Sequence, residues 1–123
     1  MKTIILNIDD DPIALFLVNN ALRNAGFSGE VLEFPDGKDL NEFIAKVEDD
    51  GNKYVLLLDI NMQDIGGWEV CDKIAEMPNK SNFEVVIITS SIDRSDRIKA
   101  EKYDFIKGFI TKPINAADVK AYF

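Results

Sequence analysis

Five polar side chains that could take part in phosphoryl chemistry follow apolar runs of this 123-residue chain. The set combines carboxylates, a hydroxyl and an ammonium: Asp9, Asp10, Asp59, Thr89 and Lys112. A carboxylate can act as the nucleophile toward a phosphoryl group, while the other groups position the phosphoryl oxygens and neutralise their charge. These residue types in this order therefore indicate a site for in-line phosphoryl transfer.

Asp59 directly follows a continuous apolar run, residues 54–58. A run without polar alternation is typical of a strand buried on both faces of a parallel sheet. Asp59 then lies at the carboxyl end of that strand, where open α/β sheets bind their ligands. Taken alone, the same residue fits the start of a turn equally well, and it is the other strand ends that favour a site.

Apolar runs and helical patterns alternate along the whole chain. We predict strands at residues 3–8, 30–34, 54–59, 84–89 and 105–111, each followed by a helix. Right-handed crossovers then give an α/β fold, with a parallel sheet covered by helices on both faces. The continuously apolar first, third and fourth strands belong in the interior and the mixed second and fifth at the edges. The order 2-1-3-4-5 satisfies this and brings the polar strand ends to one rim.

The predicted helices differ in the apolar face that they offer to the sheet. The first begins at Asp11-Pro12 and ends near Gly26. The fourth, from about Asp93 to Tyr103, is mostly charged, so we expect it to bury little surface. The expected apolar faces are Ala14, Leu17, Val18, Ala21, Leu22 and Ala25 in the first helix, Leu40, Phe43, Ile44 and Val47 in the second, Val70, Cys71, Ile74 and Ala75 in the third, and Ala116, Val119 and Phe123 in the last.

Composition restricts the classes of partner and cofactor. With 14 basic and 22 acidic residues the net charge is −8, which argues against nucleic acid or an anionic membrane as a direct partner. The chain has no histidine and only Cys71, which excludes a zinc site and fits a reducing, cytoplasmic location. The first apolar run is too short for a signal peptide or a membrane span. Oxygen donors alone favour a hard cation, Mg²⁺ or Mn²⁺ in its place.

Four segments resemble the receiver domain of two-component response regulators, in order and at the spacing of that family. They are Asn7–Pro12, Leu58–Met62, Ile88–Ser91 and Phe109–Pro113. The resemblance covers essentially the whole chain and implies a flavodoxin-like (βα)5 sandwich, with a single receiver domain over residues 1–123. The last helix is short and is a candidate for truncation, so the chain is either a stand-alone receiver or part of a longer regulator or hybrid kinase.

The resemblance also implies how the acidic residues would act. Asp59 would be the phosphoacceptor, taking a phosphoryl group from a sensor histidine kinase or a histidine phosphotransfer protein. Mg²⁺ would be held by Asp10, Asp59 and the backbone carbonyl of Asn61. Asp9 would act on the metal ion through water.

Other residues are implied to contact the phosphoryl group or to respond to it. Lys112 and Thr89 would contact its oxygens, and the peptide bond after Lys112 is typically cis in this family. Thr89 and Phe109 would form the switch, in which the aromatic rotamer follows the movement of the hydroxyl. Asn61 and Ser91 occupy positions that tune the lifetime of the phosphoryl group. A downstream protein would then bind the face made by the fourth helix, fifth strand and last helix.

Several residues depart from the usual pattern of the family. Gln63 stands where proline is very frequent, and Gly66 where an acidic residue is common, and both departures concern the stiffness of the loop after Asp59. Ser90 replaces a frequent alanine beside the site. Phe109 lacks the hydroxyl of the tyrosine often found there, so the switch must work by packing.

Two other interpretations compete with a phosphorylated switch. A pseudo-receiver would bind partners without being phosphorylated, and we would expect it to lack one of the five site residues, all of which are present. A metal-dependent phosphatase of related topology would have a second aspartate two residues after the first, where this chain has Asn61.

Overall fold

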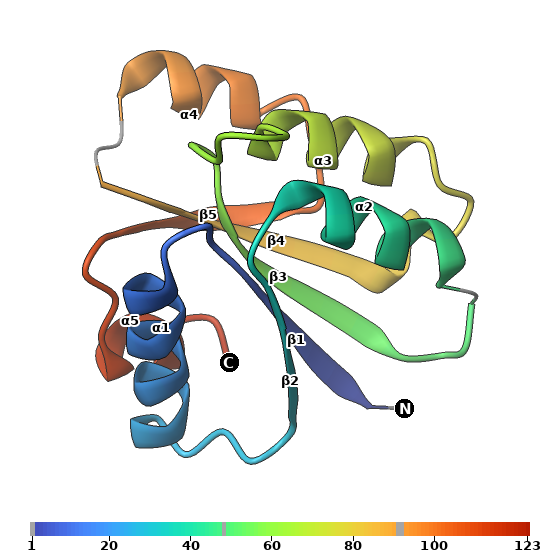
Figure 1. Cartoon of the computed structure of the whole chain (residues 1–123). Helices are drawn as coiled ribbons and strands as arrows, with labels where there is room; N and C mark the ends of the chain where they lie inside the picture. The colour runs from blue at the N-terminus through green and yellow to red at the C-terminus, as the bar shows by residue number, and fades with distance from the viewer. Residues whose placement is uncertain (1, 48, 91–92) are drawn as a thin grey trace.

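The computed structural model describes residues 2–47, 49–90 and 93–123. Within these ranges the chain forms a five-stranded parallel sheet in the order β2-β1-β3-β4-β5 (Figure 1). This confirms the predicted α/β architecture, the strand order and the edge positions of the second and fifth strands. The strands are β1 (Thr3–Ile8), β2 (Glu30–Phe34), β3 (Lys53–Asp59), β4 (Phe83–Thr89) and β5 (Ile106–Thr111).

Helices cover both faces of the sheet, as Figure 1 shows. The first and last lie together on one face, while the second and third cover the other and the fourth lies beside the third. The helices are α1 (Pro12–Asn24), α2 (Gly37–Lys46), α3 (Gly67–Ala75), α4 (Arg94–Ala100) and α5 (Ala116–Lys120), with a 3₁₀ turn at Lys80–Asn82. None of the helices in the described ranges is both long and apolar enough to cross a membrane.

Strand β1 shows how the sheet separates two apolar clusters. Successive side chains of a strand point to opposite faces, so Ile4 and Leu6 pack on the side of α2 and α3, whereas Ile5 packs with Val18 and Leu22 of α1. Strands β3 and β4 are buried in the same two-sided way. The interior strands are therefore fixed from both faces, which gives their carboxyl ends defined positions.

The apolar face of α1 differs from the expectation. Leu15 is buried in place of Leu17, which remains 40% exposed. The buried stripe contains Leu15, Val18 and Leu22, and Leu17 lies about 100° around the helix from Val18, at the margin of that stripe. A spacing rule alone does not choose between two leucines that both lie near the boundary of the face.

Two further burial expectations were wrong, and α4 is shorter than expected. Ala75 is exposed at the last residue of α3, and Phe123 lies beyond α5 with 45% of its surface exposed. Helix α4 ends at Ala100, its one buried residue, which confirms that this charged helix contributes little to the core.

Polar side chains cap the start of four of the helices in the described ranges, including Asp11 and Asp93, where the sequence indicated. Asp11 accepts a hydrogen bond from the backbone N–H of Ile13 (3.0 Å), and Asp36 accepts one from Asp39 (2.8 Å). Each bond satisfies a backbone donor that has no partner within the helix. Helix α3 differs, because it begins after Gly66 without a side-chain cap.

Candidate functional site

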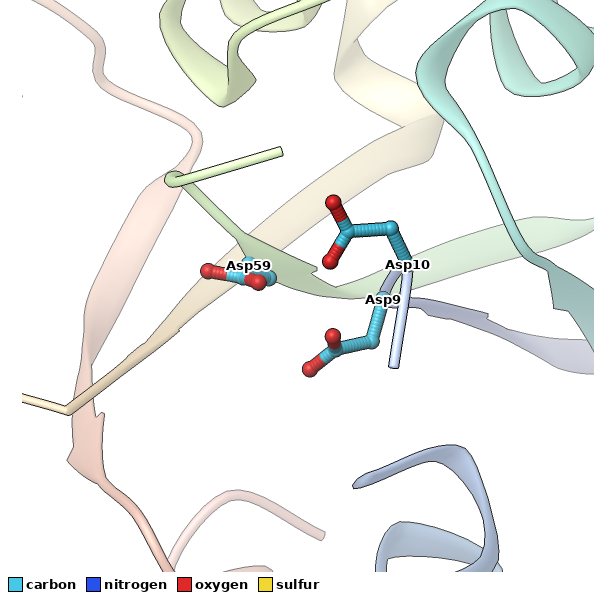
Figure 2. A group of neighbouring side chains, drawn as sticks. All are labelled: Asp9, Asp10 and Asp59. Carbon is cyan, nitrogen blue, oxygen red and sulfur yellow. The ribbon is translucent and has the colours of Figure 1, made fainter. Parts of the chain in front are cut away.

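The polar strand ends meet at one edge of the sheet. Asp59 ends β3, and Asp9 and Asp10 follow β1, its neighbour in the sheet. Figure 2 shows the three carboxylates gathered together. One oxygen of each lies within 4.8 Å of an oxygen of both others. Asp9 and Asp59 are buried, whereas Asp10 is exposed, so the cluster opens to solvent on the side of Asp10.

Lys112 brings a positive charge to these carboxylates from the end of β5. Its Nζ lies 2.7 Å from Oδ2 of Asp9 and 3.5 Å from Oδ2 of Asp59. Its backbone N–H donates to the carbonyl of Thr89 (2.8 Å), and the bond to Pro113 is cis, as the resemblance implied. Burial lowers the pKa of Lys112, but the hydrogen bond to Asp9 and the negative charge of Asp59 raise that pKa overall. The ammonium is therefore charged at neutral pH.

The carboxyl group of Asp59 has a pKa above its ordinary value. Burial is the main cause, because it disfavours the charged form, and the charge of Asp9 adds to it. The backbone N–H of Asn61, which donates to Oδ1 of Asp59 (3.0 Å), and the ammonium of Lys112 act in the opposite direction. Asp59 is thus a buried carboxylate whose negative charge is only partly compensated.

Backbone donors fix the orientation of the other two carboxylates. Oδ1 of Asp9 accepts from the N–H of Asp11 (3.0 Å), and Oδ2 of Asp10 accepts from the N–H of Gln63 (3.2 Å). The N–H of Asp9 itself donates to the carbonyl of Phe34 on β2 (3.2 Å). Contacts from two other segments therefore hold the residues that follow β1.

The charge and the donor atoms of this cluster fit a divalent metal ion. Two carboxylates about 5 Å apart repel by roughly 3 kcal/mol at an effective dielectric near 20. The ammonium of Lys112 lies beside two of the three, Asp9 and Asp59. All donors are oxygens, which suits Mg²⁺ and disfavours softer metals. Mg²⁺ usually takes one or two carboxylates and leaves positions for phosphate oxygens. The cluster is therefore suited to a magnesium ion and a phosphoryl group together.

Thr89 and Phe109, the predicted switch residues, lie at different places. Thr89 is buried at the end of β4, in register with Thr111 of β5. Phe109 is half-buried on β5, and the guanidinium carbon of Arg97 in α4 lies 5.5 Å from the centre of its ring. The structure thus places Thr89 at the edge that bears the carboxylates, and Phe109 in contact with α4.

Asn61 and Ser90 both lie close to the carboxylate cluster or to Lys112. Asn61 is exposed and contacts Asp59 through its backbone N–H. Ser90 and Lys112 both line a cavity of about 330 Å³ that extends toward the start of α1. Ser91, to which the resemblance assigned a role in phosphoryl lifetime, lies outside the described residues.

Sequence reasoning missed two contacts of the loop between β3 and α3. One is the hydrogen bond from the N–H of Gln63 to Asp10. The other is made by Asp64, whose two carboxylate oxygens accept from the N–H groups of Gly37 (3.1 Å) and Lys38 (3.0 Å) at the start of α2. These contacts join residues 26 to 53 positions apart, and no local pattern in the sequence indicates them.

Comparisons with known proteins agree on one family. Residues 5–123 match the family model described as the response regulator receiver domain. The chain is 26% identical over 119 residues to the probable methanogenesis regulatory protein FilR2 of Methanothrix harundinacea, covering 95% of this chain and 76% of that protein. Among solved structures, a two-component response regulator from Cytophaga hutchinsonii superimposes with a TM-score of 0.86 at 29% identity, covering 97% of this chain and 92% of that one.

A second relative shows the same domain within a much longer protein. The hybrid signal transduction histidine kinase L of Dictyostelium discoideum is 31% identical over 122 residues, which is 94% of this chain and 7% of that kinase. The similarity therefore concerns one domain of that kinase and does not extend to the rest of its length.

Proposed function

The chain belongs to the response regulator receiver domain family, and from this we propose that it is a signalling switch that accepts a phosphoryl group on Asp59. The observation that supports this most directly is the setting of Asp59. It is a buried carboxylate at a strand end, 3.5 Å from a lysine ammonium and within reach of two further carboxylates. Such a group is a nucleophile surrounded by the charges that a phosphoryl group requires.

Mg²⁺ is the proposed cofactor, with Mn²⁺ as a substitute. Asp10, Asp59 and the backbone carbonyl of Asn61 would hold the ion, and Asp9 would act on it through water. When bound, the ion neutralises negative charge on the phosphoryl oxygens. The all-oxygen donor set and the excess of carboxylates support this assignment.

Asp59, Lys112 and Thr89 would carry out the phosphoryl transfer itself. An oxygen of Asp59 forms a bond to phosphorus while the bond from phosphorus to the donor's histidine nitrogen breaks, and the nitrogen keeps that electron pair. The Lys112 ammonium, already between Asp9 and Asp59, would contact a phosphoryl oxygen, and the Thr89 hydroxyl would donate to another. Movement of Thr89 would then change the packing of Phe109 against α4.

The phosphodonor is proposed to be a sensor histidine kinase or a histidine phosphotransfer protein in the cytoplasm. Ile13 and Leu17 of α1 are exposed apolar residues, and they line the cavity that Lys112 and Ser90 also line. A protein that delivers a phosphoryl group to Asp59 can bury this apolar surface as it approaches. Phosphorylation and dephosphorylation of its own Asp59 would be the only chemistry that the domain performs.

The output is proposed to act through α4, β5 and α5. A cavity of about 400 Å³ lies between α4 and β5 and is lined by Arg97, Tyr103 and Phe109 among others. Because Phe109 belongs to this surface, a change in its packing alters the shape that a downstream protein meets. A pseudo-receiver that binds partners without phosphorylation is the second candidate, and the following experiment separates the two.

Incubation with MgCl₂ and acetyl phosphate should add one phosphoryl mass to the intact protein, as measured by mass spectrometry. Asp59→Asn should abolish the addition, and a chelator should prevent it. Asp39→Asn removes an exposed carboxylate of α2 and serves as the matched control that keeps the modification. Addition that survives Asp59→Asn contradicts the assignment of the phosphoacceptor. A folded wild-type protein that remains unmodified favours the pseudo-receiver.

A further inference from the structure

The hydrogen bond between Gln63 and Asp10 connects the loop after β3 to the carboxylate cluster. The donor is the backbone N–H of Gln63, and the acceptor is Oδ2 of Asp10 at 3.2 Å. Asp10 is exposed, so its side chain has few packing contacts to fix its rotamer. The bond occupies one oxygen of the carboxylate, and Figure 2 shows the other carboxylates of the cluster directly beside this group.

The loop that provides this donor is itself fixed to α2. Asp64 accepts hydrogen bonds from the N–H groups of Gly37 and Lys38 with its two oxygens. The next residue, Ile65, lies so close to Gly37 that a Cβ atom at position 37 would be 2.8 Å from Cβ of Ile65. The loop is thus held by polar bonds and by close packing immediately after Gln63. The N–H of Gln63 therefore has a defined position relative to Asp10.

The identity of residue 63 matters through its backbone. A proline in this place has no N–H and cannot make the bond, whereas any other residue type can. The side chain of Gln63 is exposed, and the contact described above involves only its main chain. The presence of a non-proline residue is therefore sufficient to provide the donor.

We propose that the backbone N–H of Gln63 is a positioning group for the divalent-cation site, holding Asp10 in the orientation in which it binds Mg²⁺. This rests on the proposed function, to which the magnesium site belongs. With Oδ2 bound to the loop, the carboxylate is oriented before the ion arrives, so binding does not have to order it. Groups that orient a metal ligand typically change metal affinity by about 10- to 100-fold, and the exposure of Asp10 places this one at the lower end.

Calorimetric titration of the purified domain with MgCl₂, without phosphodonor, tests the proposal. Gln63→Pro should raise the dissociation constant for Mg²⁺ by about tenfold, whereas Gln63→Ala, which retains the N–H, should stay within about twofold of wild type. The titration should still saturate at one Mg²⁺ per domain in Gln63→Pro, because only the affinity for the ion has changed. A merely structural disruption of the site by proline would lower that stoichiometry.

The outcomes separate this proposal from the proposed function. A wild-type protein that does not bind Mg²⁺ overturns both. Two results overturn the role of Gln63 alone while the wild type still binds Mg²⁺. One is an unchanged Mg²⁺ affinity in Gln63→Pro, and the other is an equal loss of Mg²⁺ affinity in Gln63→Ala. If Gln63→Pro does not fold, amide exchange measured by NMR decides instead. The Gln63 amide should exchange faster with solvent in Asp10→Ala than in wild type, and an unchanged rate would show that the bond does not form.

Discussion

At the scale of single residues, the carboxylate cluster is under electrostatic strain when no metal ion is bound. Asp59 is only 5% exposed and has two carboxylates near it, against one ammonium. Each carboxylate pair about 5 Å apart repels by roughly 3 kcal/mol at an effective dielectric near 20. The two repulsions and the loss of hydration of Asp59 raise the free energy of the folded state. Together they exceed the lowering that the attraction to Lys112 provides. The charge of Asp59 therefore lowers the stability of the folded domain when no metal ion is bound.

Asp59→Asn should make the protein more stable in the absence of Mg²⁺, by about 2 kcal/mol, because it removes a buried charge and two repulsions while losing one attraction. Urea unfolding in a buffer with a chelator measures the difference. Addition of Mg²⁺ should stabilise the wild type more than the variant, so the difference between their free energies of unfolding should become smaller. The Asp39→Asn control should change neither measurement. A variant less stable than wild type would show that the Lys112 contact dominates.

At the scale of elements, the loop between β3 and α3 is the contact between the site and α2. Asp64 caps α2 from outside the helix, in addition to Asp36 at its N-cap. Its pKa is lowered, first by the hydrogen bond from the backbone of Ile65 and then by those from Gly37 and Lys38. These bonds favour the ionised form, so the loop is fixed most strongly when Asp64 is charged.

Asp64→Asn should destabilise the domain by up to about 1 kcal/mol at neutral pH, a small value because Asp64 is exposed. The sign of the pH dependence follows from the lowered pKa. The stabilisation is present above the unfolded value of 3.8 and is lost as pH falls through the lower folded value. Urea unfolding of wild type and variant as a function of pH measures this. Glu42→Gln on α2 is the control. A difference in stability between wild type and Asp64→Asn that grows toward acid pH would show that the ionised Asp64 does not stabilise the domain.

Charged side chains of helix α4 contact two aromatic rings, while Ala100 is its one buried residue. Lys99 lies 5.2 Å from the ring centre of Trp68, and Arg97 lies 5.5 Å from that of Phe109. Such contacts are worth about 0.5–1 kcal/mol at exposed sites, less than the burial of a large apolar side chain. Helix α4 can therefore be moved at a small energetic cost.

At the scale of the whole molecule, the sequence predicted the sheet and the set of residues at its edge. Continuous apolar runs such as residues 54–58 are typical of strands covered on both faces, so strand positions and order could be inferred from local patterns. The choice between Leu15 and Leu17 could not, because it depends on how α1 rotates against the sheet. The contacts of Gln63 and Asp64 could not either, since a loop acquires them only when distant segments have packed.

Cys71 lies in the apolar cluster between the sheet and the helices α2 and α3, completely buried. Burial raises the pKa of its thiol to about 12, so almost no thiolate is present at neutral pH. Since it is the single cysteine of the chain, its modification reports on the opening of this cluster.

A thiol reagent such as dithiobis(nitrobenzoate) should therefore react with the native protein only as fast as it unfolds, and should react fully in urea. Ile74→Ala leaves a space within this cluster and should destabilise the domain by roughly 2–5 kcal/mol. The rate at which Cys71 is labelled should rise accordingly. Rapid stoichiometric labelling of the native wild type would show that the thiol is accessible.

The ion pair between Lys112 and Asp9 joins residues 103 positions apart in the sequence. During synthesis on the ribosome, Asp9, Asp10 and Asp59 emerge long before Lys112. A nascent chain can pair β1 with β3 and bring the carboxylates together, but it lacks the ammonium that balances them until β5 has been made. The charge balance at the edge of the sheet is thus completed only when the residue after β5 has been made, later than all three carboxylates.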